Sequence, residues 1–177
     1  MAEFSSRTCR FDAAEHVFNM TDKNALIQPD RGQKATPIHL VDKAGLESFV
    51  KTLPAAQRAA LAAQKFEAEG YQFAILPDGE GWSVVSGVAN TAELSSWCTA
   101  KLAEALPAGT YRRADGLGGP DGPAGLEGDA GPALYGWVTG QYRFDRYRAE
   151  PGKEGPRVLL TKNAKAIPSV LAEAAAT

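Results

Sequence analysis

The stretch from Tyr71 to Ala89 does most to limit the folds open to this chain. It reads YQFAILP, then DGEG, then WSVVSGVA, so a four-residue turn signal separates two β-rich runs. Two such runs joined by a glycine-containing turn are typical of a β-hairpin. The sequence therefore predicts strands at Tyr71–Pro77 and Trp82–Ala89, and a sheet with at least one antiparallel pair.

Helical and β-rich segments alternate around this hairpin. Strands are expected at Thr36–Lys43, Thr110–Asp115 and Pro156–Thr161. Apolar residues recur at helical spacing elsewhere, which predicts helices over 44–53, 54–64, 91–106 and 133–148 and a further helix start within 163–177. Strands that alternate with helices indicate a layered α/β domain.

The helix over 91–106 has a clear expected start and an apolar stripe. Asn90 is a favourable N-cap, and Glu93 follows three residues later, as in a capping box. One side of the helix is expected to be buried along a stripe of Leu94, Trp97, Cys98, Leu102 and Leu106.

Composition excludes several classes of protein. The 177 residues are 44% hydrophobic and 23% charged, with a net charge of −2, which argues against a dedicated nucleic-acid binder. No apolar run approaches the ~20 residues of a membrane span. The two cysteines, Cys9 and Cys98, form no paired framework, so a reducing, cytoplasmic location is expected.

A glycine-rich segment at 116–132 is predicted to be a surface loop. Glycine recurs at every third position through Gly119, Gly122, Gly125, Gly128 and Gly131. Five triplets inside an α/β domain cannot build a collagen helix. The segment also matches neither GxGxxG nor a P-loop, and its acidic residues lack the spacing of a calcium loop.

Side chains that could perform catalysis or hold a metal are scarce. The histidines are His16, near the N-terminus, and His39, in a predicted strand where it should face solvent or a neighbouring strand. There is no HExxH motif, no Cys/His cluster and no GxSxG, and Cys98 is expected to be a small core residue. The sequence therefore predicts no catalytic, metal-binding or cofactor-binding residue.

The helix predicted over 133–148 contains two glycines four residues apart, Gly136 and Gly140, on one face. Glycine costs a helix roughly 1 kcal/mol relative to alanine, so it is expected where a neighbouring backbone approaches closely. This pattern predicts a helix laid tightly on the sheet or against another domain. Its arginines alternate with aromatic residues, a mixture that could stack on single-stranded nucleic acid. Acidic residues intervene, however, so we expect instead that the arginine stems pack over the helix end.

This helix and its surroundings resemble the N-terminal domain of the leucyl (cytosol) aminopeptidase family. The family's motif has the form G-W-x-x-G-x-Y-x-F-x-x-Y, filled here by Gly136, Trp137, Gly140, Tyr142, Phe144 and Tyr147. The IHLVD strand, the LPAAQRAALAA helix and the GVAN strand end also match in order, while the glycine-rich loop departs from the pattern. The resemblance implies a macro-domain-like three-layer fold, with a mixed β-sheet flanked by helices, and it assigns the motif helix a structural or interface role.

The resemblance also implies a division of labour between two domains. In the family, two divalent metals (zinc or manganese) lie in a C-terminal catalytic domain, and this chain contains none of that domain's ligand motifs. The chain is therefore expected to be a fragment or a truncated paralogue, inactive alone. Its partners would be the catalytic domain of the same protein and further copies in a hexamer, without nucleic acid or membrane. Its role would be structural, in oligomerisation or in substrate access; the alternative is a free-standing macro-like module for a nucleotide or other small ligand.

Three segments are expected on these grounds. Residues 1–35 would be a flexible N-terminal extension, of which 1–19 are either an upstream addition or a natural arm. Residues 36–162 would form the α/β N-terminal domain with its loop at 116–132, and 163–177 would begin an inter-domain linker helix.

Overall fold

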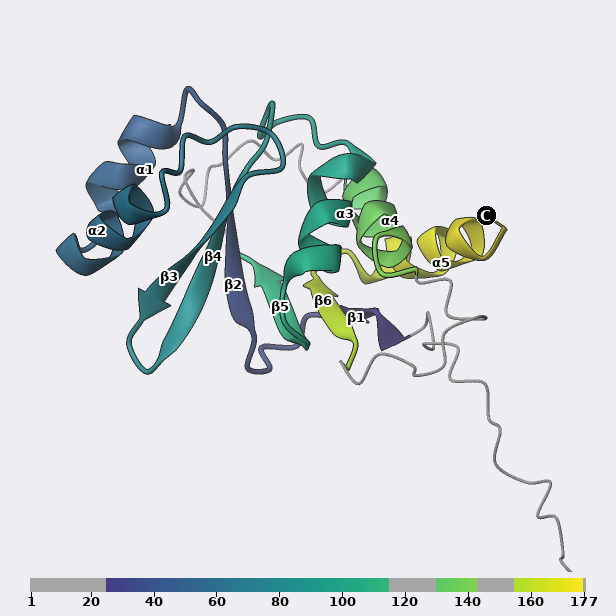
Figure 1. Ribbon diagram of the computed structural model, residues 1–177. Coiled ribbons are helices and arrows are strands. Elements are labelled where there is room, and N and C mark those ends of the chain that lie inside the picture. The colour runs from purple at the N-terminus through teal and green to yellow at the C-terminus, as the bar shows by residue number, and fades with distance from the viewer. Residues whose placement is uncertain (1–24, 115–129, 143–154, 177) are drawn as a thin grey trace, which may run out of the picture.

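The computed structural model describes residues 25–114, 130–142 and 155–176. Strands and helices alternate along the described chain (Figure 1). The strands are β1 (Ile27–Pro29), β2 (Thr36–Val41), β3 (Phe73–Asp78), β4 (Gly81–Gly87), β5 (Gly109–Arg113) and β6 (Arg157–Thr161). The α-helices are α1 (Leu46–Thr52), α2 (Ala55–Ala63), α3 (Ser96–Ala105), α4 (Ala130–Thr139) and α5 (Ile167–Ala176), the last preceded by a 3₁₀ turn at Ala164–Ala166.

The strands form one mixed sheet in the order β1-β6-β5-β2-β4-β3. β3 and β4 are the predicted antiparallel hairpin, closed between Asp78 and Gly81, where Gly79 takes a φ of +57°. The other neighbouring pairs are parallel, with β2 lying between β4 and β5. The predicted mixed sheet is confirmed.

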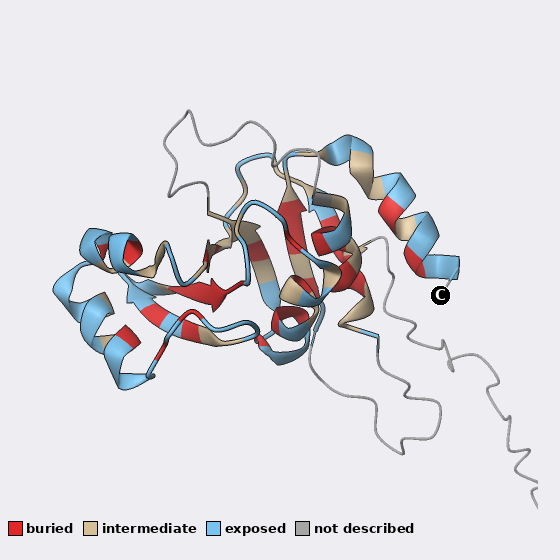
Figure 2. Ribbon diagram, turned by 90° about the horizontal axis from the view of Figure 1, so that it is seen from above, coloured by how far each residue is buried: buried red, intermediate tan, exposed pale blue. Residues whose placement is uncertain are grey.

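Helices cover both faces of this sheet, which gives three layers (Figure 1). α1 and α2 lie on one face, and α3, α4 and α5 lie on the other. In β4, consecutive residues serve the two layers, because Val84 belongs to the cluster beneath α3–α5 and Val85 to the cluster beneath α1 and α2. Both are fully buried, as expected for a central strand of a sheet covered on two sides. Figure 2 shows the buried residues along the sheet and on the inward sides of the helices.

The sheet begins earlier than the sequence predicts. β1 lies within the expected flexible extension, yet it pairs in parallel with β6 through Ile27 and Leu159. Leu26 and Ile27 are each 2% exposed, and the burial of their apolar side chains stabilises β1. The strand has only three residues and polar residues flank it, so the sequence alone does not indicate it. The prediction is therefore wrong for residues 25–35, while residues 1–24 lie outside the described part of the chain.

An ion pair fastens the segment after β1 to the sheet. The Nε atom of Arg112 in β5 lies 2.7 Å from Oδ2 of Asp30, and its Nη2 donates to Oδ1 of the same carboxylate and to the carbonyl of Gln33. The hydrogen bond from the backbone N–H of Gly32 is the main cause that lowers the pKa of Asp30 below its ordinary value; Arg112 lowers it further, and burial has an opposing effect. Residues 30–33 are thus held against β5.

The outer edge of β3 is covered by side chains from α2. Gln64 accepts a hydrogen bond from the N–H of Ile75 (3.0 Å) and donates to the carbonyl of Ile75 (2.7 Å). Gln57 donates to the carbonyl of Pro77 (2.8 Å), and Pro77 has no N–H to offer. These contacts occupy the backbone groups to which a further strand would bind.

Two helices differ in extent from the prediction. α3 begins at Ser96 because Asn90 accepts a hydrogen bond from the N–H of Ala92 and so forms a local turn instead of capping a helix. α4 begins at Ala130, inside the predicted loop at 116–132, and ends at Thr139, well before Arg148. Residues 115–129 of that loop lie outside the described residues.

Among the helices of the described segments, none is long and apolar enough to cross a membrane.

Candidate functional site

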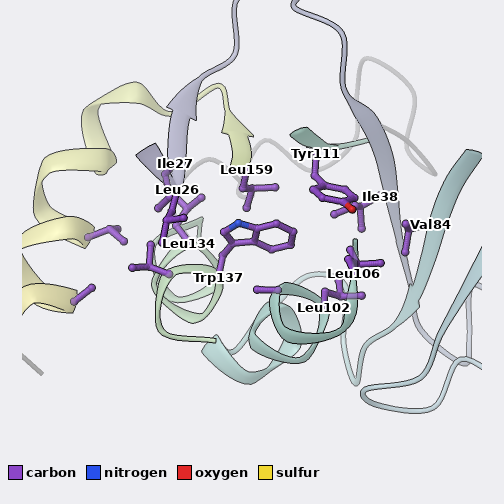
Figure 3. Packing of buried hydrophobic residues seen from close by; sticks show 14 residues of the cluster. Leu26, Ile27, Ile38, Val84, Leu102, Leu106, Tyr111, Leu134, Trp137 and Leu159 are labelled. Atoms are coloured by element: carbon purple, nitrogen blue, oxygen red, sulfur yellow. The ribbon is translucent and has the colours of Figure 1, made fainter. Parts of the chain in front are cut away.

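The centre of the predicted motif helix is buried. Trp137 is fully buried, and its indole ring lies 5.6 Å from the ring of Tyr111, centroid to centroid (Figure 3). Its Nε1–H donates to the carbonyl of Arg157 at 2.9 Å. Because a buried indole needs a partner for its N–H, this bond fixes α4 on the first residue of β6.

Polar groups around Trp137 are engaged within the fold. Gln141 both accepts from the N–H of Arg157 (2.9 Å) and donates to its carbonyl (2.8 Å). The Nε–H of Arg157 donates to the carbonyl of Leu106, and the Tyr111 hydroxyl donates to that of Pro107. Burial raises the pKa of Tyr111 to about 12, against the opposing effect of the charge on Arg157. These groups hold the strands and helices together.

Gly136 and Gly140 mark a close contact, but with a helix instead of the sheet. A Cβ atom added to Gly136 would lie 1.7 Å from the carbonyl oxygen of Ser96, and one added to Gly140 would lie 2.3 Å from that of Ala100. Both are backbone atoms of α3. Thr99 of α3 also donates a buried hydrogen bond to the carbonyl of Ala133. The predicted close approach exists, and its partner is α3.

The remaining motif residues divide into two groups. Tyr142 follows the helix and is 68% exposed, so it is not a core residue. Phe144 and Tyr147 lie outside the described residues. The structure thus gives Gly136, Trp137 and Gly140 packing roles.

A shallow groove lies along the outer side of α3. It encloses about 300 Å³ and is lined by Tyr71, Trp97, Ala100, Lys101, Glu104 and Gly140. We call it the α3 groove. Trp97 is 68% exposed and Tyr71 57% exposed, so two aromatic side chains stand over a floor that includes Ala100 and Gly140.

The exposure of Trp97 corrects the predicted apolar stripe. Leu102 and Leu106 are buried as expected, and Cys98 is partly buried against the core. Trp97 instead shares a helix face with Lys101 and Glu104, which follow it by four and seven residues. That spacing was the signal in the sequence that Trp97 faces outward.

The loop that carries Tyr71 has an unusual backbone. Lys65, Ala68 and Tyr71 all have positive φ, at 52°, 54° and 69°. The side chain of Gln72 holds the loop, since it accepts from the N–H of Glu67 (2.8 Å) and donates to the carbonyl of Lys65 (2.8 Å). Non-glycine residues persist in this region only where surrounding contacts dictate it, so Tyr71 is placed firmly beside α3.

Two other titratable groups have perturbed pKa values. Burial lowers the pKa of His39, with an opposing effect of Asp78, and the imidazole lies 5.4 Å from the ring of Phe49. His39 therefore faces α1, on the opposite side of the sheet from Ile38. The Asp42 carboxylate accepts from the N–H of Gly45 (2.7 Å) and the hydroxyl of Thr91 (2.8 Å); the bond from Gly45 is the main cause of its lowered pKa.

A metal centre of the kind found in the aminopeptidase family does not fit this part of the molecule. Within residues 25–114, 130–142 and 155–176, no three His, Cys, Asp or Glu side chains come together as a possible donor set. Asp42, the best-connected carboxylate described above, is bound by neighbouring N–H and hydroxyl groups.

The three-layer mixed sheet, with a tryptophan-centred helix packed through glycines, defines an α/β domain of the aminopeptidase N-terminal type. Residues 36–160 match the family described as M17 aminopeptidase, N-terminal domain, and the chain belongs to that family. The resemblance seen in the sequence is thereby confirmed. No individual curated protein matches the chain significantly by sequence.

Solved structures of aminopeptidases share this fold. The cytosol aminopeptidase of Coxiella burnetii is 20% identical, with a TM-score of 0.65 over 83% of this chain and 31% of that one. The bottromycin maturation enzyme BotP is 22% identical, with a TM-score of 0.52 over 81% of this chain and 31% of that one. A mutant of the tomato leucine aminopeptidase is 14% identical, with a TM-score of 0.53, over 84% and 34%. The chain thus spans about a third of the length of these proteins.

Proposed function

We propose that this chain is the non-catalytic N-terminal domain of a leucyl aminopeptidase-like protein, and that its role is structural. The whole protein would release N-terminal amino acids from peptides in the cytoplasm. Two divalent ions, zinc or manganese, would be bound by its C-terminal catalytic domain. The N-terminal domain would pack against that domain or against further copies in a hexamer, and would thereby assemble the enzyme or shape access to it. Residues 163–177, which include α5, would lead toward the catalytic domain.

One observation carries this proposal. The domain exposes aromatic side chains, Trp97 and Tyr71, over a floor that includes Ala100 and Gly140, while Arg157, Tyr111 and Asp42 hydrogen-bond within the fold. Aromatic side chains are enriched in protein–protein interfaces relative to the rest of the protein surface. Arg157, Tyr111 and Asp42 thus contribute to holding the fold together.

The alternative role as a small-ligand module has less support. In α/β sheets, ligands bind beyond the carboxyl ends of the parallel strands. Asp42 follows the carboxyl end of the central strand β2, and its carboxylate binds Gly45 and Thr91. No contact of the described residues favours a nucleotide at this place.

An activity assay tests the proposal directly. The purified chain, shown to be folded by its cooperative thermal unfolding, is incubated with leucine p-nitroanilide and manganese or zinc. We expect no turnover, because two-metal hydrolysis requires a cluster of ligands that the described residues do not form. Turnover that follows the protein peak through purification would contradict the proposal.

A further inference from the structure

Three neighbouring strands of the sheet, in the order β1-β6-β5, end beside one another (Figure 1). Both pairs that they form are parallel, so the carboxyl ends of all three strands meet at the same edge of the sheet. Five cationic side chains lie at these ends or just after them: Arg31 and Lys34 after β1, Arg112 in β5, and Lys162 and Lys165 after β6. We call these five residues the basic edge.

The residues of the basic edge come together around one carboxylate, that of Asp30. The Nε atom of Arg112 lies 2.7 Å from Oδ2 of Asp30. The N–H of Asp30 donates to the carbonyl of Thr161 at 2.9 Å, which brings the segments after β1 and β6 side by side. The charge of Lys162 is also among the causes that lower the pKa of Asp30. All three strands thus contribute to one charged surface.

The turn that carries Arg31 and Lys34 is fixed to the sheet. The side chain of Gln33 accepts a hydrogen bond from the N–H of Arg31 (2.7 Å) and donates one to the carbonyl of Pro29 (3.1 Å). The carbonyl of Gln33 in turn accepts from Nη2 of Arg112 (2.7 Å). Because this backbone is already ordered, a ligand that binds the two exposed side chains need not order it.

The basic edge has a charge opposite to that of the whole chain. Its five cations and the carboxylate of Asp30 leave a formal charge of +4, whereas the chain has a net charge of −2. The other half of the sheet, formed by β4 and β3, has acidic side chains in the loop before β3 and at the hairpin: Glu67, Glu69, Asp78 and Glu80. An anionic ligand is therefore attracted to the basic edge and repelled from the opposite side.

The arrangement suits an extended anion better than a compact one. A compact anion is held by N–H groups or a guanidinium that converge on one point. Here the guanidinium of Arg112 already binds Asp30, and Arg31, Lys34 and Lys165 are exposed on separate segments. β1 and β5 are two strand spacings apart, about 10 Å, and the side chains widen the edge to roughly 20 Å. An extended peptide of about six to eight residues has this length.

A nucleic acid suits the basic edge less well. Duplex DNA carries a negative charge about every 1.7 Å, so a duplex would continue past the edge toward the acidic half of the sheet. Domains dedicated to nucleic acids are basic overall, unlike this chain. Single strands stack their bases on aromatic rings. The large exposed aromatic residues of the described segments, Tyr71, Trp97 and Tyr142, lie outside the segments that form the basic edge.

We propose that the basic edge is a docking surface for an acidic segment of a partner protein, about six to eight residues long and rich in Asp and Glu. Carboxylates of this segment pair with Arg31, Lys34 and Lys165, while Asp30 keeps Arg112 in place. The basic edge shares no residue with the α3 groove, so this docking goes beyond the structural role proposed above and does not depend on it.

Fluorescence anisotropy of a labelled octaglutamate peptide, titrated with the full chain, tests the docking. In about 20 mM salt we expect saturable binding with a Kd on the order of 100 µM, because exposed ion pairs each contribute little. Raising the salt to about 200 mM shortens the Debye length to below about 10 Å and should weaken the binding roughly 10-fold. An octaglutamine peptide should not bind.

Charge reversals locate the binding. Lys34→Glu and Lys165→Glu should each raise the Kd at least about 5-fold, because each replaces an attraction at the basic edge by a repulsion. The matched control is Lys65→Glu, which changes the net charge equally at an exposed position after α2 and should alter the Kd less than about 2-fold. Thermal unfolding of each variant shows that its fold is intact.

Three results would overturn the docking. The first is the absence of saturable peptide binding up to about 1 mM chain at low salt. The second is an equal loss in all three variants, since net charge alone would then explain the binding. The third is tighter binding of a DNA duplex of about 20 base pairs than of the peptide at about 150 mM salt, which would make the edge a nucleic-acid surface. Peptidase activity of the chain would contradict the proposed function alone.

Discussion

Replacing Gly136 by alanine should destabilise the domain, although alanine is the better helix former. The added Cβ would lie 1.7 Å from the carbonyl oxygen of Ser96 and 2.6 Å from its carbonyl carbon. Both atoms belong to the backbone of α3, so no rotamer change relieves the clash. The contact must lengthen by about 1.5–2 Å to reach ordinary van der Waals separation, which pushes α4 off α3.

The magnitude follows from two opposing effects. Removing glycine from a helix interior stabilises it by roughly 1 kcal/mol. Overpacking a close contact costs about 1–3 kcal/mol, and the rigidity of the backbone at Ser96 places Gly136→Ala at the upper end or beyond. We therefore expect a net loss of about 2 kcal/mol or more, which lowers the urea midpoint by roughly 1 M.

Gly131 supplies the matched control on the same helix. A Cβ atom added there meets nothing within 4 Å, so Gly131→Ala should be neutral or stabilising by up to about 1 kcal/mol. Urea unfolding followed by tryptophan fluorescence measures both variants. If Gly136→Ala proved as stable as the unmodified chain, α3 and α4 would not pack as closely as described, and the interpretation of the glycine pair would be refuted.

Three further predictions concern other parts of the fold. Trp137→Ala should cost about 3–5 kcal/mol in the free energy of unfolding, whereas Trp97→Ala should change it by less than about 0.5 kcal/mol; a large loss for Trp97 would contradict its exposure. The pKa of His39 lies below its ordinary value of 6.5, so the unfolded chain binds the proton more tightly and the stability conferred by the neutral imidazole is lost as the pH falls below about 6.5. In His39→Gln the free energy of unfolding should fall less steeply as the pH falls below about 6.5. An unchanged slope would mean that other groups cause this loss of stability. Gln64→Ala should lower stability by about 1 kcal/mol and uncover the N–H and carbonyl of Ile75, so light scattering should rise with concentration; scattering equal to that of the unmodified chain would show that the β3 edge needs no cover.

Elements with a strong local signal were predictable from the sequence. The hairpin followed from its turn, and Gly79 takes the positive φ that such turns require. The alternation of strands and helices was enough to predict the layers. The close approach at Gly136 and Gly140 followed from their spacing, but the partner did not, because a glycine shows that something comes near without showing what.

Other features depend on tertiary contacts that no local pattern contains. β1 has only three residues, and its stability comes from pairing with β6 and from the bond between Asp30 and Arg112. Asn90 had the sequence of a helix cap, yet its side chain forms a turn with Ala92. The hydrophobicity of Trp97 favours a position in the core, whereas its spacing from Lys101 and Glu104 favours the exposed face that it occupies. The α3 groove could not be predicted, because Tyr71 reaches it from a loop that is distant in the sequence.

The pairing of β1 with β6 also has a consequence for the order of folding. β1 is synthesised before every other strand of the sheet, but its hydrogen-bonding partner, from Leu159 to Thr161, is the last strand to leave the ribosome. During synthesis, Leu26 and Ile27 must therefore remain without the neighbour that buries them, while the central strands can already associate. Contacts between residues so far apart in the chain form slowly, because a large loop must close first. Completion of this edge is thus the step of folding at which the first and the last strand of the sheet in chain order meet, and a nascent chain stalled before Leu159 would leave Leu26 and Ile27 open to chaperones.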